Sequence, residues 1–353
     1  MSKIILDCGL MKTPASGLYY YCLNLGLYIN ELLESSGQPA LNFYVPSKQE
    51  QAFGNTKNTI VERSIHRYVK PFLWDCKVWH APFQSGRIIP YHNKKIKVVL
   101  TVHDLNPLHQ DLPREEQKKS IAHTQKLINR SSAVVCISEF VKEDVLRNCE
   151  VKNKPVYVIH NGINALQKPE LAVTSCRPLR PFLFAMGFVN RKKNFHVLLP
   201  LLQHNPDIEL VIAGRLDEPD YIDYLKKYAQ GKGVSDRLHI IGPVNEQEKA
   251  WYLNHCAAFM QPSLAEGFGL PVVEAMSLGK PLFLSTRTSL PEIGGDAAFY
   301  FDSFKPDHMR QVYAAGMMEY SKNGLASKII ERSKQFNWKD KAEEYIKVYE
   351  SLL

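Results

Sequence analysis

The chain alternates between short apolar runs and longer segments whose apolar residues recur with the period of a helix. Most apolar runs are continuous, which favours strands buried on both faces of a parallel sheet. Strands are predicted in the first half near Ile4–Asp7, Leu41–Val45, Val78–His80, Val98–Val102, Ala133–Ile137 and Val156–Ile159. In the second half they are predicted near Phe182–Met186, Ile208–Ala213, Leu238–Ile241, Ala257–Met260, Pro281–Leu284 and Ala298–Phe301. Helices are predicted at Glu115–Arg130, Glu139–Arg147, Asn194–Gln203 and Tyr221–Ala229.

This alternation of strands and helices predicts an α/β fold with doubly wound parallel sheets. The pattern runs through once and restarts after a proline-rich stretch without a periodic apolar face, which is typical of a linker. We therefore predict an N-terminal Rossmann-like domain over residues 1–168 and a C-terminal one over 169–336, facing each other across a cleft. Residues 337–353 form an amphipathic helix that packs locally or crosses back to the first domain.

Length and composition exclude several other classes of protein. The 353 residues suffice for two cores, and 45% hydrophobic with 23% charged residues is ordinary for a globular chain. No apolar run approaches the ~18–20 residues that span a bilayer. The apolar run near the N-terminus is too short for the hydrophobic region of a signal peptide. The seven cysteines are widely spaced without C-x-x-C, which argues against a disulfide framework. We expect a cytoplasmic protein.

The net charge of +8 is unevenly distributed. Residues 1–168 carry 22 Lys and Arg against 14 Asp and Glu, whereas residues 169–353 carry 22 of each. This excess is either a solvated basic surface or a surface that faces an anionic membrane or a phosphorylated, lipid-linked acceptor. Nucleic acid is not expected, because no basic stripe is interleaved with aromatic residues. A peripheral position at the inner face of a membrane is one consequence.

The richest loop for chemistry follows the predicted strand at 257–260. Two glycines allow a tight turn there, and a helix predicted over 271–278 follows at once. Such a loop offers backbone N–H groups and the positive end of a helix dipole to a diphosphate. Glu274, one turn into the helix, can hydrogen-bond the vicinal hydroxyls of a ribose, and Glu266 can reach another part of the same ligand. The predicted donor-binding residues of this loop are Gly267, Phe268, Gly269, Leu270 and Glu274.

Two further loops add candidates for a diphosphate site. Arg191, Lys192 and Lys193 follow the strand at 182–186, and a diphosphate would neutralise these three consecutive cations. An exposed basic turn is the alternative interpretation. Ser289 follows the strand at 281–284 and can either contact the phosphates or form a capping box with Glu292.

The first domain offers fewer candidates. His103 and Asp104 end the predicted strand at 98–102, at an edge where ligands bind in parallel sheets. A structural histidine is the alternative to a reactive one. Ser16 and Gly17 begin a helix after the first strand, where the glycine lets a substrate approach the backbone.

These motifs together resemble the retaining glycosyltransferases of family 4, which have the two-domain GT-B fold. The resemblance covers nearly the whole chain. The stretch Glu266–Met276 is similar to the E-x7-E element of that family, its most specific signature, and Ser289–Ala298 continues the pattern. In the first half, Thr101–Leu105, Ile137–Phe140 and Val158–Ile163 resemble the family's landmarks.

The resemblance implies a transfer of a hexose, of the mannose or glucose/galactose type, from a nucleotide-sugar such as GDP-mannose or a UDP-hexose to a glycan or lipid acceptor. It implies an α-linked product, no metal and no other cofactor, and a role in bacterial surface polysaccharide or lipopolysaccharide synthesis. By similarity, Glu274 binds the ribose, Glu266 the donor sugar and Lys193 the diphosphate, assisted by Arg191 or Lys192. The resemblance places His103 at the reaction centre.

By the same similarity, Ser16 and Gly17 lie near the donor phosphate or the acceptor. The chain departs from the family at two points. Many members have arginine at the position of Phe188 and a Gly-Gly pair at the position of Ser16-Gly17.

Other functions fit the sequence less well. A nicotinamide oxidoreductase lacks support because no G-x-G-x-x-G follows the first strand. A periplasmic binding protein would need an export signal. A catalytically silent GT-B subunit and a non-transferring enzyme such as a hydrolysing epimerase remain alternatives, which turnover with or without an acceptor would distinguish.

Overall fold

The computed structural model describes residues 3–13, 16–54, 58–85, 88–110, 112–164, 166, 174 and 176–353, except for the side chain of Asn323. The chain divides into two compact units, one formed by Met1–Gly162 with Phe336–Leu353 and the other by Ile163–Gln335. The predicted boundary between residues 168 and 169 lies outside the described residues and stays a prediction. No helix in the described residues is long and apolar enough to cross a membrane.

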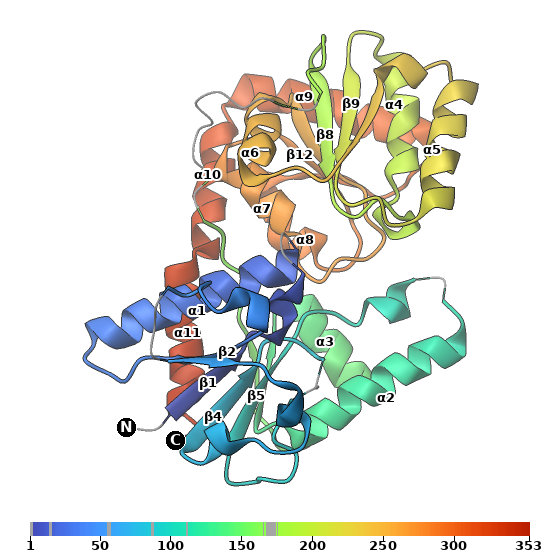
Figure 1. The fold of residues 1–353 in the computed structure, drawn as a ribbon. Coiled ribbons are helices and arrows are strands. Elements are labelled where there is room, and N and C mark those ends of the chain that lie inside the picture. The colour runs from blue at the N-terminus through green and yellow to red at the C-terminus, as the bar shows by residue number, and fades with distance from the viewer. Residues whose placement is uncertain are drawn as a thin grey trace. The chain divides into compact units, whose positions relative to one another are not determined.

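Unit 1 contains a parallel sheet in the order β3-β2-β1-β4-β5-β6-β7 (Figure 1). Its strands are β1 (Lys3–Asp7), β2 (Asn42–Val45), β3 (Thr59–Val61), β4 (Cys76–Ala81), β5 (Lys97–Val102), β6 (Ala133–Cys136) and β7 (Val156–Val158). Its α-helices are α1 (Gly17–Ser35), α2 (Arg114–Arg130), α3 (Glu139–Asn148) and α11 (Trp338–Glu350). The six strands predicted here are confirmed within one or two residues at either end. The edge strand β3 was missed, because only two of its residues, Ile60 and Val61, are apolar and polar residues flank them.

Unit 2 repeats the same order of strands, β10-β9-β8-β11-β12-β13, again all parallel. The strands are β8 (Phe182–Met186), β9 (Glu209–Ala213), β10 (Leu238–Gly242), β11 (Ala258–Gln261), β12 (Leu282–Ser285) and β13 (Phe299–Phe301). The helices are α4 (Leu199–His204), α5 (Pro219–Gly231), α6 (Glu246–His255), α7 (Leu270–Ser277), α8 (Leu290–Gly294), α9 (Pro306–Asn323) and α10 (Ala326–Ser333). The predicted strands and the doubly wound α/β class are confirmed.

One predicted helix of unit 2 differs from the prediction. The helix expected over Asn194–Gln203 is divided into a 3-10 turn, Phe195–Leu198, and the short helix α4. Asn194 has a left-handed φ of 58°, so it cannot be a residue of the helix itself, and Pro200 lies in the first turn of α4. The apolar period is intact, because Phe195, Leu198, Leu199, Leu201 and Leu202 are all buried.

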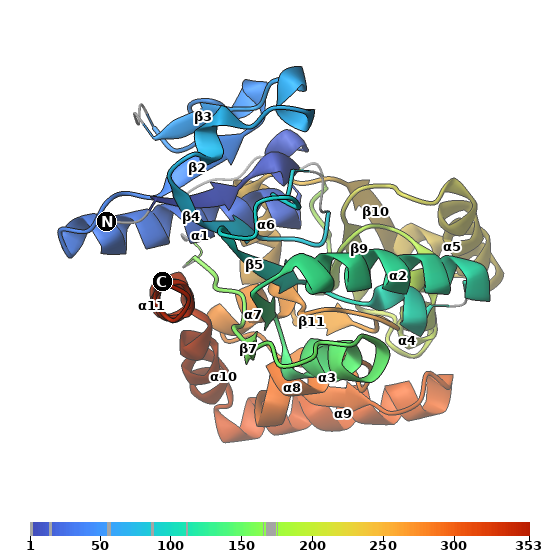
Figure 2. The same cartoon turned by 90° about the horizontal axis from the view of Figure 1, so that it is seen from below.

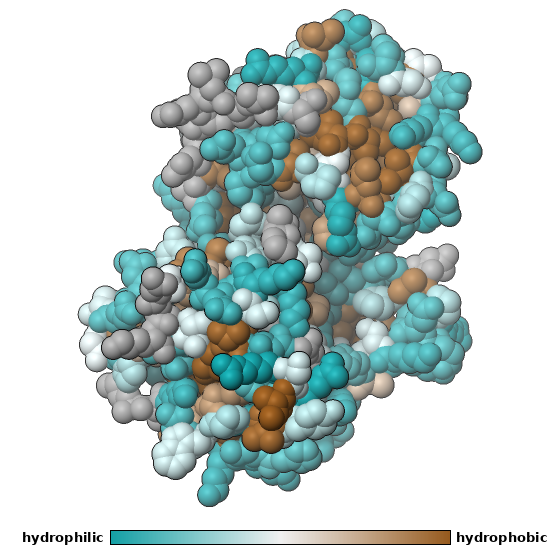
Figure 3. Space-filling view, in the orientation of Figure 1, coloured by the Kyte–Doolittle hydropathy of each residue, from teal (hydrophilic) through white to brown (hydrophobic). Residues whose placement is uncertain are grey.

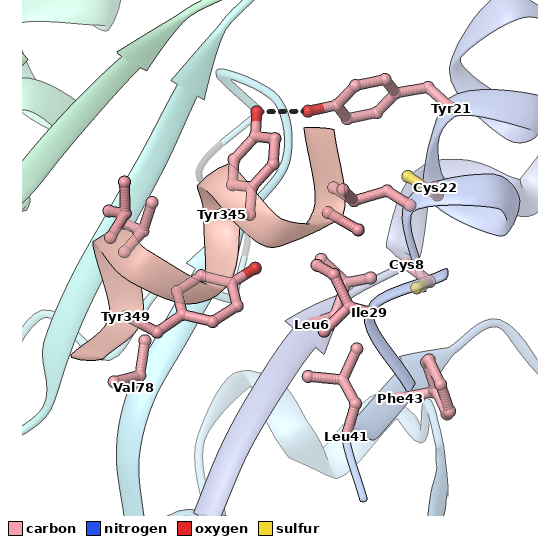
Figure 4. Packing of buried hydrophobic residues seen from close by; sticks show 14 of the residues in the cluster. Leu6, Cys8, Tyr21, Cys22, Ile29, Leu41, Phe43, Val78, Tyr345 and Tyr349 are labelled. Carbon is pink, nitrogen blue, oxygen red and sulfur yellow. Dashed lines mark hydrogen bonds between the residues drawn. The ribbon is translucent and has the colours of Figure 1, made fainter. Parts of the chain in front are cut away.

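The C-terminal helix α11 belongs to unit 1, where it packs beside α1 (Figures 1 and 2). Trp338, Tyr345 and Tyr349 are buried in a core that also contains Leu6, Val78 and other residues of the strands. Figure 4 shows the hydroxyl groups of Tyr21 and Tyr345 joined by a hydrogen bond of 2.6 Å.

A chain of buried polar groups continues from that bond. The hydroxyl of Tyr345 lies 3.1 Å from Thr101 Oγ1, which lies 2.9 Å from Nε2 of His80. Nδ1 of His80 lies 2.7 Å from the hydroxyl of Tyr349. Because an unpaired buried polar group is costly, these bonds fix α11 in one position on the sheet.

Candidate functional site

In unit 2 the order of strands reverses between β8 and β11, which pair directly. Ligands of doubly wound sheets bind outside the carboxyl ends of the strands at this switch point. Two loops meet there. Leu264 N donates to the carbonyl of Lys192 at 2.8 Å, and the Asn194 amide donates to the carbonyl of Pro262 at 3.2 Å. The predicted basic loop and the predicted glycine loop therefore lie together.

Glu266 and Lys193 form the central pair of this region. Nζ of Lys193 lies 2.5 Å from Oε1 of Glu266, and the side chains are only 12% and 10% exposed. Gln261, the last residue of β11, donates from Nε2 to the same oxygen at 2.6 Å. Burial raises the pKa of Glu266, but Lys193 and Lys192 lower it by more, so that the pKa lies below its ordinary value. Glu266 is therefore ionised and held in one position.

The backbone of Glu266 is also fixed. Its N–H donates to Thr288 Oγ1 at 2.9 Å, and its carbonyl accepts from the hydroxyl of Ser289 at 2.9 Å. Thr288 has a φ of 53°, which β-branched residues rarely adopt and which costs of order 1–3 kcal/mol. Strain of this kind gathers at functional sites, where surrounding bonds maintain it.

The capping box with Glu292, the alternative interpretation of Ser289, does not form. The Ser289 side chain makes no cap hydrogen bond to α8, since its proton goes to Glu266. A donated proton is no longer available to a phosphate oxygen, so what Ser289 can still offer a phosphate is its backbone N–H.

Glycines allow Lys193 its position. A Cβ at Gly187, the residue after β8, would lie 2.7 Å from Cε of Lys193. A Cβ at Gly214, after β9, would lie 1.9 Å from the carbonyl oxygen of Gly187. Both have φ values, 148° and 142°, that only glycine adopts readily. The close packing of these two turns lets Lys193 lie across the end of β8.

Glu274 occupies the fifth position of α7. Its Oε1 lies 2.6 Å from Nζ of Lys249, which lies 2.8 Å from Glu246. Burial lowers the pKa of Lys249, but the two carboxylates raise it by more, so the net pKa is above its ordinary value. Lys249 is thus a buried cation that orients Glu274. Burial raises the pKa of Glu274 above its ordinary value, and Lys249 offsets only part of that rise.

The turn that precedes α7 is tightly closed. Gly267, Phe268 and Gly269 are buried and Leu270 is half-buried. Gly269 is left-handed, with a φ of 97°, and begins the helix without a side-chain cap. Its Cβ would lie 3.1 Å from Leu290. Pro271 has no N–H, and the N–H of Val272 donates to the carbonyl of Gly269 at 2.9 Å, so among the first three residues of α7 only Leu270 has an N–H to offer an anion.

The remaining cations of the predicted set differ in their surroundings. Lys192 is half-buried and contributes to the low pKa of Glu266. Arg191 is exposed and contacts Glu218 at 4.0 Å and the ring of Tyr221 at 5.7 Å, so the structure does not bring it to Glu266. Phe188 is 40% exposed, and the guanidinium of Arg215 lies 4.1 Å from its ring centroid. Arg215 therefore places a guanidinium beside the position at which this chain has phenylalanine, and that guanidinium also pairs with Asp217 at 2.6 Å.

In unit 1, His103 follows β5 and is buried. Its Nε2 lies 2.8 Å from the carbonyl of Pro82, which can only accept, so Nε2 carries the proton and Nδ1 keeps a lone pair. Burial lowers its pKa to about 4. The ring contacts Tyr21 edge-on at 4.6 Å, which links it to the polar chain that holds α11. His103 is therefore a neutral acceptor at physiological pH.

Asp104, Ser16 and Gly17 have local contacts. Asp104 Oδ1 accepts from the N–H of Asn106 at 3.0 Å, which shapes the turn after β5. Ser16 is the N-cap of α1, since its Oγ accepts from Tyr19 N at 3.1 Å and donates to the carbonyl of Thr13. Gly17 is exposed at the start of the helix. The Gln84 side chain accepts from the N–H of His103 at 3.0 Å and donates to the carbonyl of Asp104 at 2.8 Å, which fixes these two neighbours together.

The buried imidazoles predict a dependence of stability on pH. His80 and His103 have pKa values lowered to about 3 and about 4 in the folded protein, against 6.5 for an ordinary histidine. Unfolding therefore takes up protons below pH 6.5, and the stability that neutrality provides is present above 6.5 and lost as the pH falls. For His103 alone the loss is roughly 3 kcal/mol by pH 4.

This prediction is checked by urea unfolding at several pH values for the wild type and His103→Gln. We expect a smaller pH dependence between pH 6.5 and 4 in the variant. Identical pH dependence in both proteins would contradict the lowered pKa of His103.

The structure adds four residues that the sequence analysis missed: Gln261, Thr288, Lys249 and Arg215. Gln261 had a signal, since a polar residue ends an otherwise apolar run before the glycine loop. The sequence around Lys249 and Arg215 contains no such signal, because it looks like that of an ordinary surface lysine or arginine. Thr288 was within a predicted phosphate loop, but its backbone strain is invisible in sequence.

Two units with the same Rossmann-like order of strands define an α/β protein of GT-B fold, with a carboxylate–lysine pair at the switch point of the second sheet. The model described as "Glycosyl transferases group 1" matches residues 175–336, and "Glycosyltransferase Family 4" matches residues 57–165. The chain belongs to this family of glycosyltransferases.

Curated relatives are similar over much of their length. The chain is 24% identical over 294 residues to O-antigen chain mannosyltransferase B of Escherichia coli, covering 78% of this chain and 74% of that protein. It is 26% identical over 318 residues to the lipopolysaccharide core biosynthesis mannosyltransferase LpsB of Rhizobium meliloti (strain 1021), covering 82% and 83%. Other relatives are longer, and the chain spans about a third of their length.

Solved structures agree in fold. Anabaena Alr3699/HepE in complex with UDP superposes with a TM-score of 0.77 at 16% identity, covering 99% of this chain and 100% of that one. At this identity the similarity shows the GT-B fold and no more.

Proposed function

We propose that this glycosyltransferase is a retaining hexosyltransferase. It moves a hexose of the mannose or glucose/galactose type from a nucleotide-diphosphate sugar to a hydroxyl of a glycan or lipid-linked acceptor, giving an α-linkage. The observation that carries the proposal is the Lys193–Glu266 pair at the switch point, followed eight residues later by Glu274 on the helix that opens at Gly269. The proposed setting is bacterial surface polysaccharide or lipopolysaccharide synthesis at the cytoplasmic face of the membrane.

The comparisons support the substrate classes. The relatives named above are mannosyltransferases of O-antigen and lipopolysaccharide core synthesis. Structures of similar fold contain UDP, or UDP-glucose. GDP-mannose and a UDP-hexose are therefore the donors to test first.

In the proposed donor complex, Glu274 accepts hydrogen bonds from the two ribose hydroxyls. Lys249 holds the carboxylate at 2.6 Å and stays charged, so the acceptor oxygens are oriented before the nucleotide arrives. The N–H of Leu270 at the start of α7 and the ammonium group of Lys193 face the diphosphate. Glu266, ionised by its neighbours, contacts the donor sugar.

The chemical step follows from these charges. As the bond to the nucleoside diphosphate breaks, negative charge grows on the leaving phosphate, and Lys193, Lys192 and Arg215 supply positive charge near the end of β8. These side chains do the work that a divalent cation does elsewhere, so we propose a metal-independent reaction. The ionised Glu266 stabilises the positive charge that develops on the sugar. The acceptor hydroxyl attacks from the face that the diphosphate leaves, and the leaving phosphate takes its proton.

Unit 1 is proposed to act on the acceptor side. His103 offers a lone pair on Nδ1 and no positive charge, so it serves as a hydrogen-bond acceptor for a sugar hydroxyl and not as a general acid. Ser16, Gly17 and Asp104 are proposed to line the approach of the acceptor or the donor phosphate.

Thermal unfolding with a panel of nucleotide-sugars tests the donor site. One base class among UDP-, GDP-, ADP- and dTDP-sugars is expected to stabilise the wild type, by roughly 2.7 kcal/mol at a hundred times the dissociation constant. Glu274→Ala is expected to weaken that binding about ten- to a hundredfold, because charge-assisted hydrogen bonds to the ribose are lost.

Glu246→Ala is the matched control, since it removes the other carboxylate partner of Lys249 and leaves Glu274 in place. Equal stabilisation of wild type and Glu274→Ala would overturn the ribose assignment. With the donor known, NMR of the product reports the configuration of the transferred sugar, and a β-linked product would exclude retention. Donor consumption without transfer would instead indicate a hydrolysing or epimerising enzyme.

A further inference from the structure

The crossover from β3 to β4, residues 62–75, has an unusual surface for a connection in this fold. It contains two short 3-10 turns, Ser64–Arg67 and Pro71–Leu73, and no α-helix (Figure 2). Crossovers between parallel strands usually carry a helix with one apolar face. Here the apolar residues divide between the inner and the outer side of the segment.

The inner side anchors the crossover to the sheet. His66 and Leu73 are buried. Nδ1 of His66 lies 3.2 Å from the hydroxyl of Tyr44, on β2, and also accepts from the N–H of Arg63. The Phe72 ring lies 5.3 Å from the ring of Tyr44. These contacts already pack the segment against the sheet. Apolar residues on its solvent-facing side are therefore not required for this packing.

The outer side nevertheless exposes four large apolar or aromatic side chains. Trp74 is 93% exposed, Tyr68 84%, Ile65 59% and Val69 55%. Elsewhere in the described residues, exposed large hydrophobic side chains are scattered along the chain. Figure 3 shows a few brown side chains among teal and pale ones on the part of the molecule that Figure 1 draws in blue and cyan, and its hydropathy scale draws tyrosine and tryptophan pale. A cluster of exposed apolar groups on one short segment marks an interaction surface.

The charges around this segment are of one sign. Its two acidic residues are already paired, Glu62 with Lys12 at 2.8 Å and Asp75 with Lys3 at 3.1 Å. The three cations of the segment and Lys77, at the start of β4, form no ion pair with a carboxylate in the part of the chain that the structure describes. These cations are Arg63, Arg67, Lys70 and Lys77.

A cavity of about 390 Å³ opens beside the start of the segment. Three cationic side chains and two serines line it together with Pro46 and Glu62. The lining cations and serines are Lys12, Lys48, Arg63, Ser47 and Ser64. Ammonium, guanidinium and hydroxyl donors of this kind suit a phosphate group.

We propose that residues 63–77 dock the protein on the surface of an anionic phospholipid bilayer. Tryptophan and tyrosine prefer the interface between headgroups and acyl chains, and cations beside them bind anionic headgroups. A second copy of the chain fits this surface poorly, because a two-fold contact would bring the same four cations against one another. The proposal does not depend on which sugar the enzyme transfers.

The fluorescence of Trp74 makes a direct test. Trp79 and Trp338 are buried and Trp251 is half-buried, whereas Trp74 faces water. Addition of vesicles of phosphatidylcholine with phosphatidylglycerol is expected to shift the emission of the wild type to shorter wavelength, and sedimentation with the vesicles gives the partition constant. Vesicles of phosphatidylcholine alone are expected to produce a much smaller shift.

Variants separate the apolar from the charged contribution. Tyr68→Ser/Trp74→Ser and Arg67→Glu/Lys70→Glu are each expected to lower the partition constant at least about tenfold. The matched controls are Leu27→Ser/Leu146→Ser and Lys118→Glu/Lys119→Glu, which change exposed residues of the same unit by the same number of apolar groups or charges. The controls are expected to bind like the wild type.

Three outcomes would overturn the proposal: no binding of the wild type to the anionic vesicles, equal losses in the controls, or concentration-dependent self-association that Tyr68→Ser/Trp74→Ser abolishes. Transfer to a soluble acceptor sugar is expected to be unchanged in both patch variants. If the wild type does not transfer sugar to any acceptor, the proposed function is contradicted. If it transfers sugar but does not bind anionic vesicles, only the docking surface is contradicted.

Discussion

Replacing Lys193 with methionine is expected to lower the rate of sugar transfer by about a hundred- to a thousandfold. Lys193 is 12% exposed in its side chain and is held between Gly187 and Glu266, so its charge is preorganised and poorly solvated. A charge in this position stabilises the departing diphosphate far more than a charge in water would. Methionine keeps much of the volume and removes the charge.

The change also leaves Glu266 buried without its ionic partner, which can cost ~3–5 kcal/mol of stability. The double variant Lys193→Met/Glu266→Gln removes both charges and is expected to recover most of that stability but none of the activity. Lys227→Met, an exposed lysine of α5, is the control. Initial rates with saturating donor are measured beside unfolding midpoints, and a Lys193→Met enzyme within tenfold of the wild-type rate would remove Lys193 from the catalytic step.

Truncation of Trp338 to alanine is expected to destabilise unit 1 by about 3–5 kcal/mol. Trp338 is 2% exposed and belongs to the same core as α1 and the strands. Its Cα lies 2.7 Å from the position that a Cβ on Gly162 would take, so backbone and ring are tightly enclosed. The cavity left by the indole therefore has little scope to collapse.

Urea unfolding followed by far-UV circular dichroism measures this loss, and the transition of unit 1 is expected to move to lower urea. Lys339→Ala, the next residue on the same helix and exposed to solvent, is expected to change stability little. Because Tyr345 bonds Tyr21 and the Tyr21 ring contacts His103, the weakened helix is also expected to slow transfer. A destabilisation below about 1 kcal/mol would show that α11 contributes little to this core.

The candidate site divides into residues that the sequence could indicate and residues that it could not. Glu266, Glu274 and Lys193 stand in loops at strand ends, and their spacing around a glycine turn is unusual enough to indicate function. The side chains that hold these residues in place could not be predicted from the sequence. Lys249 reaches Glu274 from 25 positions away on α6, a contact that depends on how α6 packs beside α7.

Arg191 and Arg215 show that sequence proximity can also suggest the wrong cation. The sequence favoured Arg191 because it adjoins Lys192 and Lys193, but the backbone turns at Asn194 and leaves Arg191 with Glu218 and Tyr221. Arg215 is 27 residues from Phe188 and meets its ring because β8 and β9 are neighbours. Adjacency in sequence is a poor guide to which cation faces a ligand.

By itself, the sequence determined the two doubly wound units and the loops that carry chemistry, because continuous apolar runs, helical periods, glycines and prolines act over a few neighbouring residues. Only the tertiary structure decided that α11 completes the core of unit 1, that Thr288 holds the backbone of Glu266, and that the outer side of residues 63–77 is exposed. These features arise from contacts between distant segments, where a residue's environment depends on which strands are neighbours and which face each strand presents. The pattern of neighbouring residues specifies neither which strands are adjacent nor which face each strand presents.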